Sequence, residues 1–242
     1  MDAISFGTSG WRATLDVFTT PRVRMVAQAV ADHLADEGRA SDPVAVGYDA
    51  RETSRGFAEE IARVLAANGH DVLLPARDCP TPMVAHAIVT RDLAGGLVVT
   101  ASHNPPEYNG VKFFPATGAP SMPLVTEAIE ANLREPVTAP ESEWGEIREV
   151  DIVEPHLEDA LERLTPDLDG LSIVYDAMYG SGRGVTDRLL ERAGAEVTCL
   201  HCERDPEFGG GAPEPSRERL QPLVEAVRER DADLGIANDG DA

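Results

Sequence analysis

The feature that most constrains the fold is the alternation of two sequence periods along the chain. Short apolar runs, such as residues 44–48 and 96–100, have the length and the β-branched content of buried strands. Residues 23–36 instead repeat apolar positions every three or four residues, as an amphipathic helix does. Strand and helix signals follow one another through most of the 242 residues. This alternation is typical of α/β domains, in which helices cover the faces of a sheet.

The pattern predicts two such units joined by a linker. Expected strands are 44–48, 71–74, 96–100, 111–114, 171–175, 196–200 and 233–237, and expected helices are 23–36, 57–68, 83–89, 124–133, 152–164, 184–193 and 217–230. We expect Ser54 to cap the second helix and Gly69 to end it. Between 135 and 151 the periodicity is lost in a stretch rich in proline and acidic residues, which predicts a linker. The predicted domains are therefore 1–140 and 152–242.

The charge of the chain excludes two classes of partner. There are 43 Asp and Glu against 21 Lys and Arg, which gives a formal net charge of −22. Such a surface repels phosphate backbones and anionic lipids, so we expect neither nucleic acid nor membrane as a partner. The acids run through every segment, and Lys112 is the only lysine. This combination indicates a halophilic protein, whose self-repulsion is screened in a high-salt cytoplasm.

Cysteine content and segment hydropathy predict a soluble, cytoplasmic location. Three cysteines cannot build a disulfide framework, and they fit a reducing compartment. The first residues do not read as a signal peptide, and no run approaches eighteen apolar residues.

Residues 95–106, Gly-Gly-Leu-Val-Val-Thr-Ala-Ser-His-Asn-Pro-Pro, place a serine at the end of a buried strand. Two prolines hold the turn rigid, and His103 stands beside Ser102. A serine in this position can act as a nucleophile or carry a covalent group. An ordinary turn, with Ser102 and Asn104 bonding the backbone, explains the same residues equally well. A serine hydrolase is disfavoured because no nucleophile-elbow glycine pattern surrounds Ser102.

Three further groups could handle phosphate or metal. Residues 6–12 form a glycine-spaced, hydroxyl-rich loop ending in Arg12, which suits a phosphate unless the terminus is merely flexible. Lys112 follows the serine turn closely, and a lysine, unlike an arginine, can lose its proton and act as a base. Asp239 and Asp241 offer hard oxygen ligands that suit Mg²⁺, although two acids in so acidic a chain also arise by chance.

Two other motifs are weaker. Cys199 and Cys202 have the spacing of half a zinc site, but no second pair completes the coordination. Residues 180–184, Gly-Ser-Gly-Arg-Gly, resemble a dinucleotide loop without its full glycine frame, so a turn before a helix is the better interpretation.

Taken together, these stretches closely resemble the α-D-phosphohexomutase superfamily. Residues 100–106 match its phosphoserine loop, and Asn-Gly-Val-Lys at 109–112 follows at the family's spacing. Residues 6–12 look like its N-terminal motif. Residues 205–210 with 213–215 are similar to its second-domain loop, and 239–241 to the opening of its metal loop, Asp-Gly-Asp-x-Asp-Arg.

The resemblance implies the fold and a mechanism. It implies the first two of four α/β domains, each with a mixed sheet sandwiched by helices. Ser102 would carry a phosphoryl group, donate it to a hexose phosphate, and recover it from a hexose 1,6-bisphosphate after that intermediate reorients. Mg²⁺ held by Ser102, Asp239 and Asp241 would neutralise charge on the transferring group. By the same resemblance Lys112 would be the general base, Arg12 would steady the phosphoryl group, and His103 would orient the site.

The form of the motifs favours a phosphoglucomutase or phosphomannomutase. A phosphoglucosamine mutase stays open as an alternative, as does an inactive two-domain fragment that only binds sugar phosphate or a partner. Because the resemblance places the sugar-selecting and phosphate-binding loops in two later domains, we expect residues 1–242 alone not to turn over. The sequence sets no oligomeric state.

Overall fold

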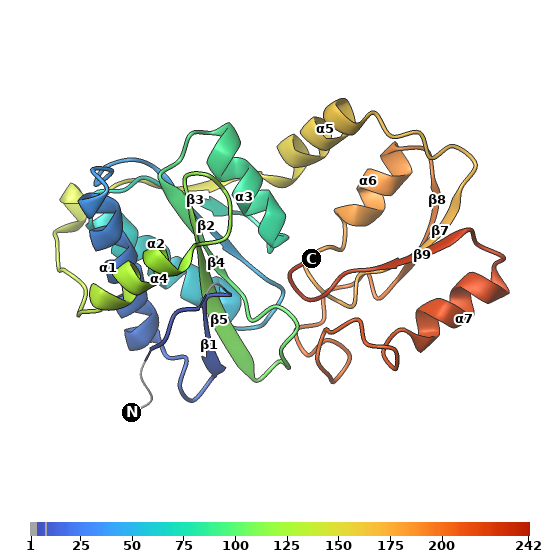
Figure 1. Cartoon of the computed structure of the whole chain (residues 1–242), viewed down its shortest axis with the longest axis horizontal. Coiled ribbons are helices and arrows are strands. Elements are labelled where there is room, and N and C mark those ends of the chain that lie inside the picture. The colour runs from blue at the N-terminus through green and yellow to red at the C-terminus, as the bar shows by residue number, and fades with distance from the viewer. Residues whose placement is uncertain (1–3, 8) are drawn as a thin grey trace.

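Two α/β units lie side by side along the long axis of the molecule (Figure 1). The computed structural model describes residues 4–7 and 9–242. The first unit is built on a six-stranded sheet with the order β1-β5-β4-β2-β3-β6. Its strands are β1 (Trp11–Thr14), β2 (Val44–Tyr48), β3 (Val72–Pro75), β4 (Gly95–Val99), β5 (Tyr108–Pro115) and β6 (Ile147–Val150).

The first sheet is mixed, as expected. Strands β4, β2, β3 and β6 pair in parallel, whereas β5 runs antiparallel to both β4 and β1. The loop that follows β4 therefore returns immediately along β5, which brings Lys112 beside Val98 in the register. This hairpin positions most of the site described below.

Helices cover both faces of this sheet because the side chains of its strands alternate. Val44, Val46 and Tyr48 of β2 face one apolar core, and Ala45 faces the other. The first core is closed by α1 (Thr20–Asp36), α2 (Ser54–Ala67) and α4 (Pro123–Ala131). The second core is closed by α3 (Thr81–Thr90) and α5 (Val153–Leu164).

Several helices begin earlier than their apolar periodicity predicts. A proline occupies the first or second position of α1, α3 and α4, where the missing N–H has no intrahelical partner in any case. The expectation for Ser54 was wrong. Thr53 is the N-cap residue, and the Ser54 hydroxyl donates to Asp49 Oδ1 at 2.6 Å instead of capping the helix.

The predicted linker was also wrong in part. Residues 135–151 contain a short 3₁₀ helix, η1 (Glu141–Glu143), and strand β6, which pairs in parallel with β3. Strand β6 reads Ile-Arg-Glu-Val and is mostly exposed, so it lacks the apolar signal by which the inner strands were recognised. The first sheet therefore extends to Val150.

The second unit is a smaller, three-stranded sheet with the order β8-β7-β9, and its strands are all parallel. These are β7 (Ser172–Asp176), β8 (Glu196–Leu200) and β9 (Leu234–Ala237). Helices α6 (Thr186–Arg192) and α7 (Gln221–Glu229) lie on opposite sides of the sheet (Figure 1). We expected mixed sheets in both units. The first sheet is mixed, whereas the described strands of the second are all parallel.

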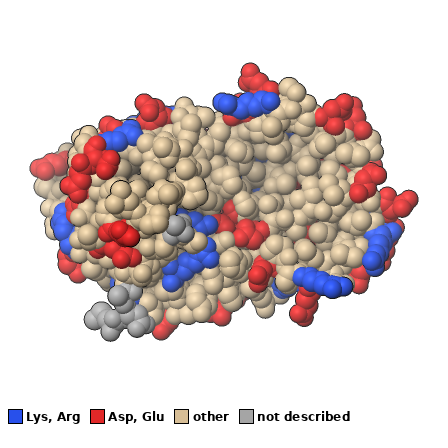
Figure 2. Space-filling model, in the orientation of Figure 1, with Lys and Arg blue, Asp and Glu red and all other residues tan. Residues whose placement is uncertain are grey.

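A buried ion pair joins the two units. Both terminal guanidinium nitrogens of Arg183 donate to the carboxylate of Asp78, at 2.6 and 2.7 Å. Acidic side chains are scattered over the visible face of both units (Figure 2), as the composition predicts. Within the described residues, no helix combines the length and the apolar character needed to cross a bilayer.

Candidate active site

Ser102 stands where β4 ends, in a loop whose shape is fixed by its own backbone contacts. Its backbone is left-handed, with φ of +53°, and its N–H donates to Thr100 Oγ1 at 2.8 Å. Non-glycine residues in this region are uncommon and cluster at functional sites. The residue is buried, and its hydroxyl donates to Asp239 Oδ2 at 2.7 Å. The serine of the first unit is thus joined directly to a carboxylate of the second.

The segment after β9 brings both predicted metal carboxylates to this serine. Asp241 Oδ2 accepts hydrogen bonds from Lys112 Nζ and from Thr81 Oγ1, each at 2.6 Å. Burial by itself would raise the pKa of Asp241, but the ion pair with Lys112 and hydrogen bonds from Lys112, Thr81 and Ser102 hold that pKa below its usual range. Asp241 is therefore a carboxylate at neutral pH.

The glycine-rich segment 180–184 packs against the loop that carries Asp239 and Asp241. Ser181 donates to the carbonyl of Gly240 through both its N–H and its hydroxyl, each at 3.1 Å. A β-carbon on Gly180 would lie 2.8 Å from the carbonyl oxygen of Asp239. The interpretation of these glycines as a turn before a helix is confirmed, because the segment leads directly into α6.

Arg12 lies on β1 with its side chain running across Gly110 of β5. One guanidinium nitrogen donates to Asn104 Oδ1 at 3.1 Å, in the turn that holds Ser102. The Nε of Arg12 is buried and has no hydrogen-bond partner among the described residues. An unpaired buried donor of this kind is costly, and an anionic ligand is one group that satisfies it. Of the preceding loop, Thr8 lies outside the described residues.

His103 is placed differently from the other predicted site residues. Its side chain is exposed, and the described part of the chain shows no hydrogen bond from it to Ser102. The adjacent Ser102 and His103 therefore do not form a nucleophile–base pair in this structure, which removes the geometric support for a serine hydrolase.

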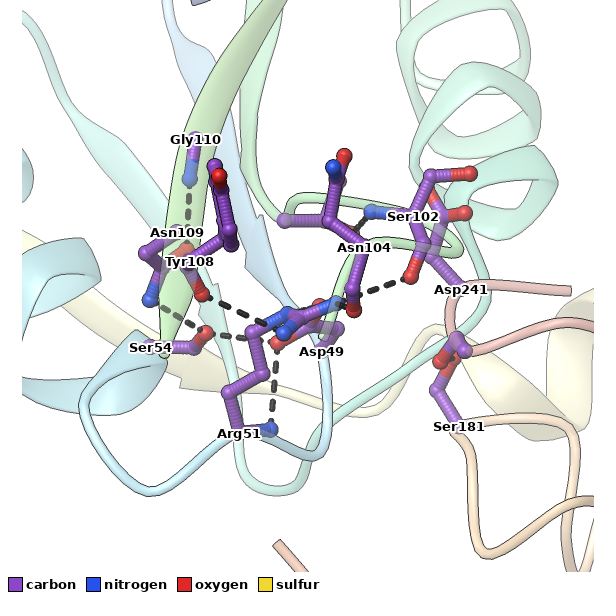
Figure 3. Close-up of polar contacts among 12 residues, drawn as sticks. Asp49, Arg51, Ser54, Ser102, Asn104, Tyr108, Asn109, Gly110, Ser181 and Asp241 are labelled. Carbon is purple, nitrogen blue, oxygen red and sulfur yellow. Dashed lines mark hydrogen bonds and ion pairs between the residues drawn. The ribbon is translucent and has the colours of Figure 1, made fainter. Parts of the chain in front are cut away.

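Arg51 was not among the predicted site residues, and it holds the serine loop from beneath (Figure 3). Its guanidinium donates to four main-chain carbonyls of this loop, at distances between 2.6 and 3.2 Å, namely those of Ser102, Asn104, Pro105 and Tyr108. The side chain is 1% exposed and forms an ion pair with Asp49 at 3.0 Å. The position of an Asp and an Arg directly after β2, at the same sheet edge as Ser102, was the available signal.

Asp49 connects the same loop to helix α2. Burial raises the pKa of Asp49, against the opposing effects of Arg51 and of the Ser54 hydroxyl. The amide of Asn109 then donates to Thr53 Oγ1 and Ser54 Oγ, both at 3.0 Å. This chain of contacts fixes the start of β5 relative to the start of α2.

The second-unit loop at 205–210 packs against this network. Phe208 is fully buried, with its ring 5.0 Å from the guanidinium carbon of Arg51. Asp205 accepts hydrogen bonds from the N–H groups of Glu207 and Gly209, and Arg219 donates to the carbonyl of Phe208. The motif at 205–210 therefore contributes to the contact between the two units.

Replacing Gly110 with alanine is expected to lower the free energy of unfolding by about 1–3 kcal/mol, because the core there is already filled. The new β-carbon would lie 2.5 Å from the Thr100 carbonyl oxygen and 2.9 Å from Arg12 Cγ. Gly56 is the matched control, since it is exposed in α2 and a β-carbon there meets nothing within 4 Å. Gly56→Ala is expected to raise stability by up to about 1 kcal/mol. Urea denaturation of both variants checks this, and equal midpoints would contradict it.

The sequence matches known protein-family models over nearly its whole length. Two family models match the chain: alpha/beta/alpha domain I of phosphoglucomutase/phosphomannomutase at residues 3–138, and domain II at residues 154–242. The chain belongs to the phosphoglucomutase/phosphomannomutase family, and it consists of two consecutive α/β/α domains of that family.

Individual relatives are similar over nearly the whole chain. A protein named "Probable phosphoglucosamine mutase" from Methanopyrus kandleri is 38% identical over 98% of this chain and 52% of its own length. A phosphoglucomutase/phosphomannomutase from Thermococcus kodakarensis is 32% identical over 98% of this chain and 53% of its own. A crystal structure of a phosphomannomutase-type protein from Thermus thermophilus aligns with a TM-score of 0.89 at 32% identity, over 100% of this chain and 56% of that one. The chain spans about half the length of the curated relatives it matches.

Proposed function

We propose that this chain provides the phosphoserine and metal-binding part of a phosphohexomutase, which moves a phosphoryl group between the 1- and 6-positions of a hexose phosphate. The observation that carries the proposal is the 2.7 Å hydrogen bond from Ser102 Oγ to Asp239 Oδ2. It brings together the serine of the first domain and the acidic loop of the second, which lie 137 residues apart. The left-handed backbone at Ser102 further supports a functional role for this turn.

In the proposed reaction the phosphoryl group passes from Ser102 to a hydroxyl of the hexose phosphate. The bond from Ser102 Oγ to phosphorus breaks and a bond from the sugar oxygen to phosphorus forms. A base takes the proton of the sugar hydroxyl, and the departing Ser102 Oγ takes up a proton to become a hydroxyl again. The resulting hexose 1,6-bisphosphate then reorients in the site. The Ser102 hydroxyl gives up its proton and bonds the other phosphorus, and the sugar oxygen on that phosphorus leaves and takes up a proton. Positioning and charge neutralisation are the main demands of such a transfer.

The residues around Ser102 fit a magnesium ion. The oxygens of Ser102, Asp239 and Asp241 are all hard ligands, and the two carboxylates approach the serine from one loop. In the proposal these three residues hold Mg²⁺, which when bound would neutralise negative charge on the transferring phosphoryl group.

The neighbouring cations have distinct parts in the proposal. Arg12 would steady the phosphoryl group through its unpartnered Nε, while its other contact stays on Asn104. Lys112 is proposed as the base, with Asp241 holding its amine in place between turnovers. His103 is exposed at the rim of the turn, so its proposed role is limited to orienting an incoming substrate.

The hexose itself has two candidate classes. The Gly-Trp-Arg form of the first motif favours glucose or mannose phosphates, and the Thermococcus relative carries that name. The Methanopyrus relative, which is more similar to this chain, is named for glucosamine phosphate. Glucosamine phosphate is therefore at least as well supported as the other two sugars.

The test is phosphoryl uptake from hexose 1,6-bisphosphates. The chain is incubated with the bisphosphates of glucose, mannose and glucosamine, with Mg²⁺ or with a chelator, and release of hexose monophosphate is measured. We expect stoichiometric release with Mg²⁺ and none with Ser102→Ala. Because the resemblance places the sugar-selecting loop in a later domain, the three bisphosphates should react at similar rates with this chain. Release that persists in Ser102→Ala would overturn the proposal. That residues 1–242 do not complete the full isomerisation stays a prediction, which the same samples test with a hexose monophosphate as substrate.

A further inference from the structure

Two cysteines and an aspartate meet at the edge of the second sheet, away from the site described above. Cys199 lies in β8, Cys202 follows it by three residues, and Asp187 lies in α6. One ligand atom from each of the three lies within 4.8 Å of the other two. The turn that brings the thiols together is fixed by His201, whose backbone is left-handed with φ of +50°.

The fold adds a third possible metal ligand, Asp187, to the two cysteines. The cysteine pair on its own was only half of a zinc site, and the structure adds a carboxylate from a different element. Cys199 Sγ lies 3.8 Å from Asp187 Oδ2. With zinc–sulfur bonds of about 2.3 Å and zinc–oxygen bonds of about 2.0–2.2 Å, tetrahedral ligands stand about 3.5–3.8 Å apart. The separation between Cys199 and Asp187 already matches this spacing, and the other two pairs lie within 4.8 Å, so they would shorten by about 1 Å at most.

The cluster also lacks a cation. Asp187 Oδ1 is buried and has no hydrogen-bond partner among the described residues, and no lysine or arginine of the described chain forms an ion pair with Asp187. Burial raises the pKa of both thiols, and the nearby Asp187 raises it further. A bound divalent cation would balance the charge of Asp187 and would favour the thiolate form of each cysteine.

His201 is not part of this set. Its Nδ1 forms a hydrogen bond with Asp176 Oδ1 at 2.9 Å, and its ring lies tilted by 38° against that of Tyr179, with centroids 4.6 Å apart. Three protein ligands leave a fourth tetrahedral position for water.

We propose that Cys199, Cys202 and Asp187 bind one thiophilic divalent cation of the Zn²⁺ class, with water as the fourth ligand. This site is independent of the proposed function and of the magnesium site. The ion would fasten α6 to strand β8. Such a link would hold the helix in place, because each of its residues is at least partly exposed. Residue Thr186, next to Asp187, donates to Asn238 Oδ1 at 3.2 Å, so the fastened helix also contacts the segment that leads to Asp239.

Cobalt titration of the reduced chain tests the site, because Co²⁺ reports sulfur ligation and tetrahedral geometry in its absorption spectrum. With the thiols kept reduced, we expect one equivalent to give a thiolate-to-cobalt band and tetrahedral d–d bands, both removed by added Zn²⁺. Cys199→Ser and Asp187→Asn should each weaken the affinity at least about tenfold. The controls Cys79→Ala and Ser102→Ala remove a thiol or an oxygen ligand elsewhere and should leave the spectrum unchanged.

Three results would overturn the proposal. The first is a cobalt spectrum with no thiolate band, and the second is an octahedral spectrum that Ser102→Ala removes. The third is a thiolate band that survives in Cys199→Ser and disappears in Cys79→Ala. Far-ultraviolet circular dichroism of each variant establishes that it is folded, so loss of the band reports loss of a ligand. Failure here leaves the phosphoryl uptake at Ser102 unaffected.

Discussion

Replacing Arg51 with methionine is expected to lower the free energy of unfolding by about 3–5 kcal/mol, because removing one partner of a buried ion pair leaves the other charge uncompensated. Asp49 is fully buried in this pair. The substitution also removes the donors for four carbonyls of the Ser102 loop. Urea denaturation followed by circular dichroism measures the change.

Arg55 is the matched control for this experiment. It lies four residues further along the chain, and its side chain is 54% exposed, with Glu59 as an ion-pair partner. Exposed pairs of this kind contribute about 0.2–1 kcal/mol, so Arg55→Met should change stability far less. The double variant Asp49→Asn, Arg51→Met should recover part of the loss by removing the buried charge. Equal stability of Arg51→Met and Arg55→Met would contradict this account of the serine loop.

The second large effect is expected at Lys112. If its amine takes the proton of the sugar hydroxyl, Lys112→Met should slow phosphoryl transfer from Ser102 to hexose phosphate by about 10²–10⁴-fold, the usual contribution of a general base. Single-turnover transfer from the phosphorylated chain measures this rate without any need for later steps.

Lys112→Arg separates the base from the ion pair. Arginine keeps a positive charge next to Asp241 but does not lose its proton in proteins. The proposal therefore expects Lys112→Arg to be nearly as slow as Lys112→Met, while retaining more of the wild-type stability. A transfer rate for Lys112→Arg close to that of the wild type would mean that Lys112 acts only through its ion pair with Asp241.

Much of the fold could be predicted because buried strands leave a strong local signal. Strand β2 begins and ends where its apolar run does, since every one of its residues is buried. Strand β8 also has its predicted bounds, 196–200, although none of its residues is buried. Strand β6 could not be found in this way, because it is an exposed edge strand whose pairing with β3 is decided by the sheet. Long-range pairing of this kind leaves no period in the strand itself.

The site residues also divide into those with a local sequence signal and those that only long-range contacts bring into the site. Ser102 and the acids at 239 and 241 were recognisable because their neighbours are specific in sequence, and the structure brings them together. Arg51 and Asp187 were not among the predicted site residues, because each acts through the fold: Arg51 through carbonyls of a loop about fifty residues away, and Asp187 through cysteines on another element. Main-chain acceptors have no residue identity, so sequence alone does not indicate which arginine they bind.

The proposed reaction depends above all on a phosphoryl group carried by Ser102. The most direct measurement is the intact mass of the purified chain after incubation with a hexose 1,6-bisphosphate and Mg²⁺, before and after phosphatase, followed by mapping of the modified peptide. The account predicts a species about 80 Da heavier that is lost with phosphatase, maps to Ser102, and is absent in Ser102→Ala. A chain that stays unmodified under these conditions, or a modification that maps to another residue, would contradict it.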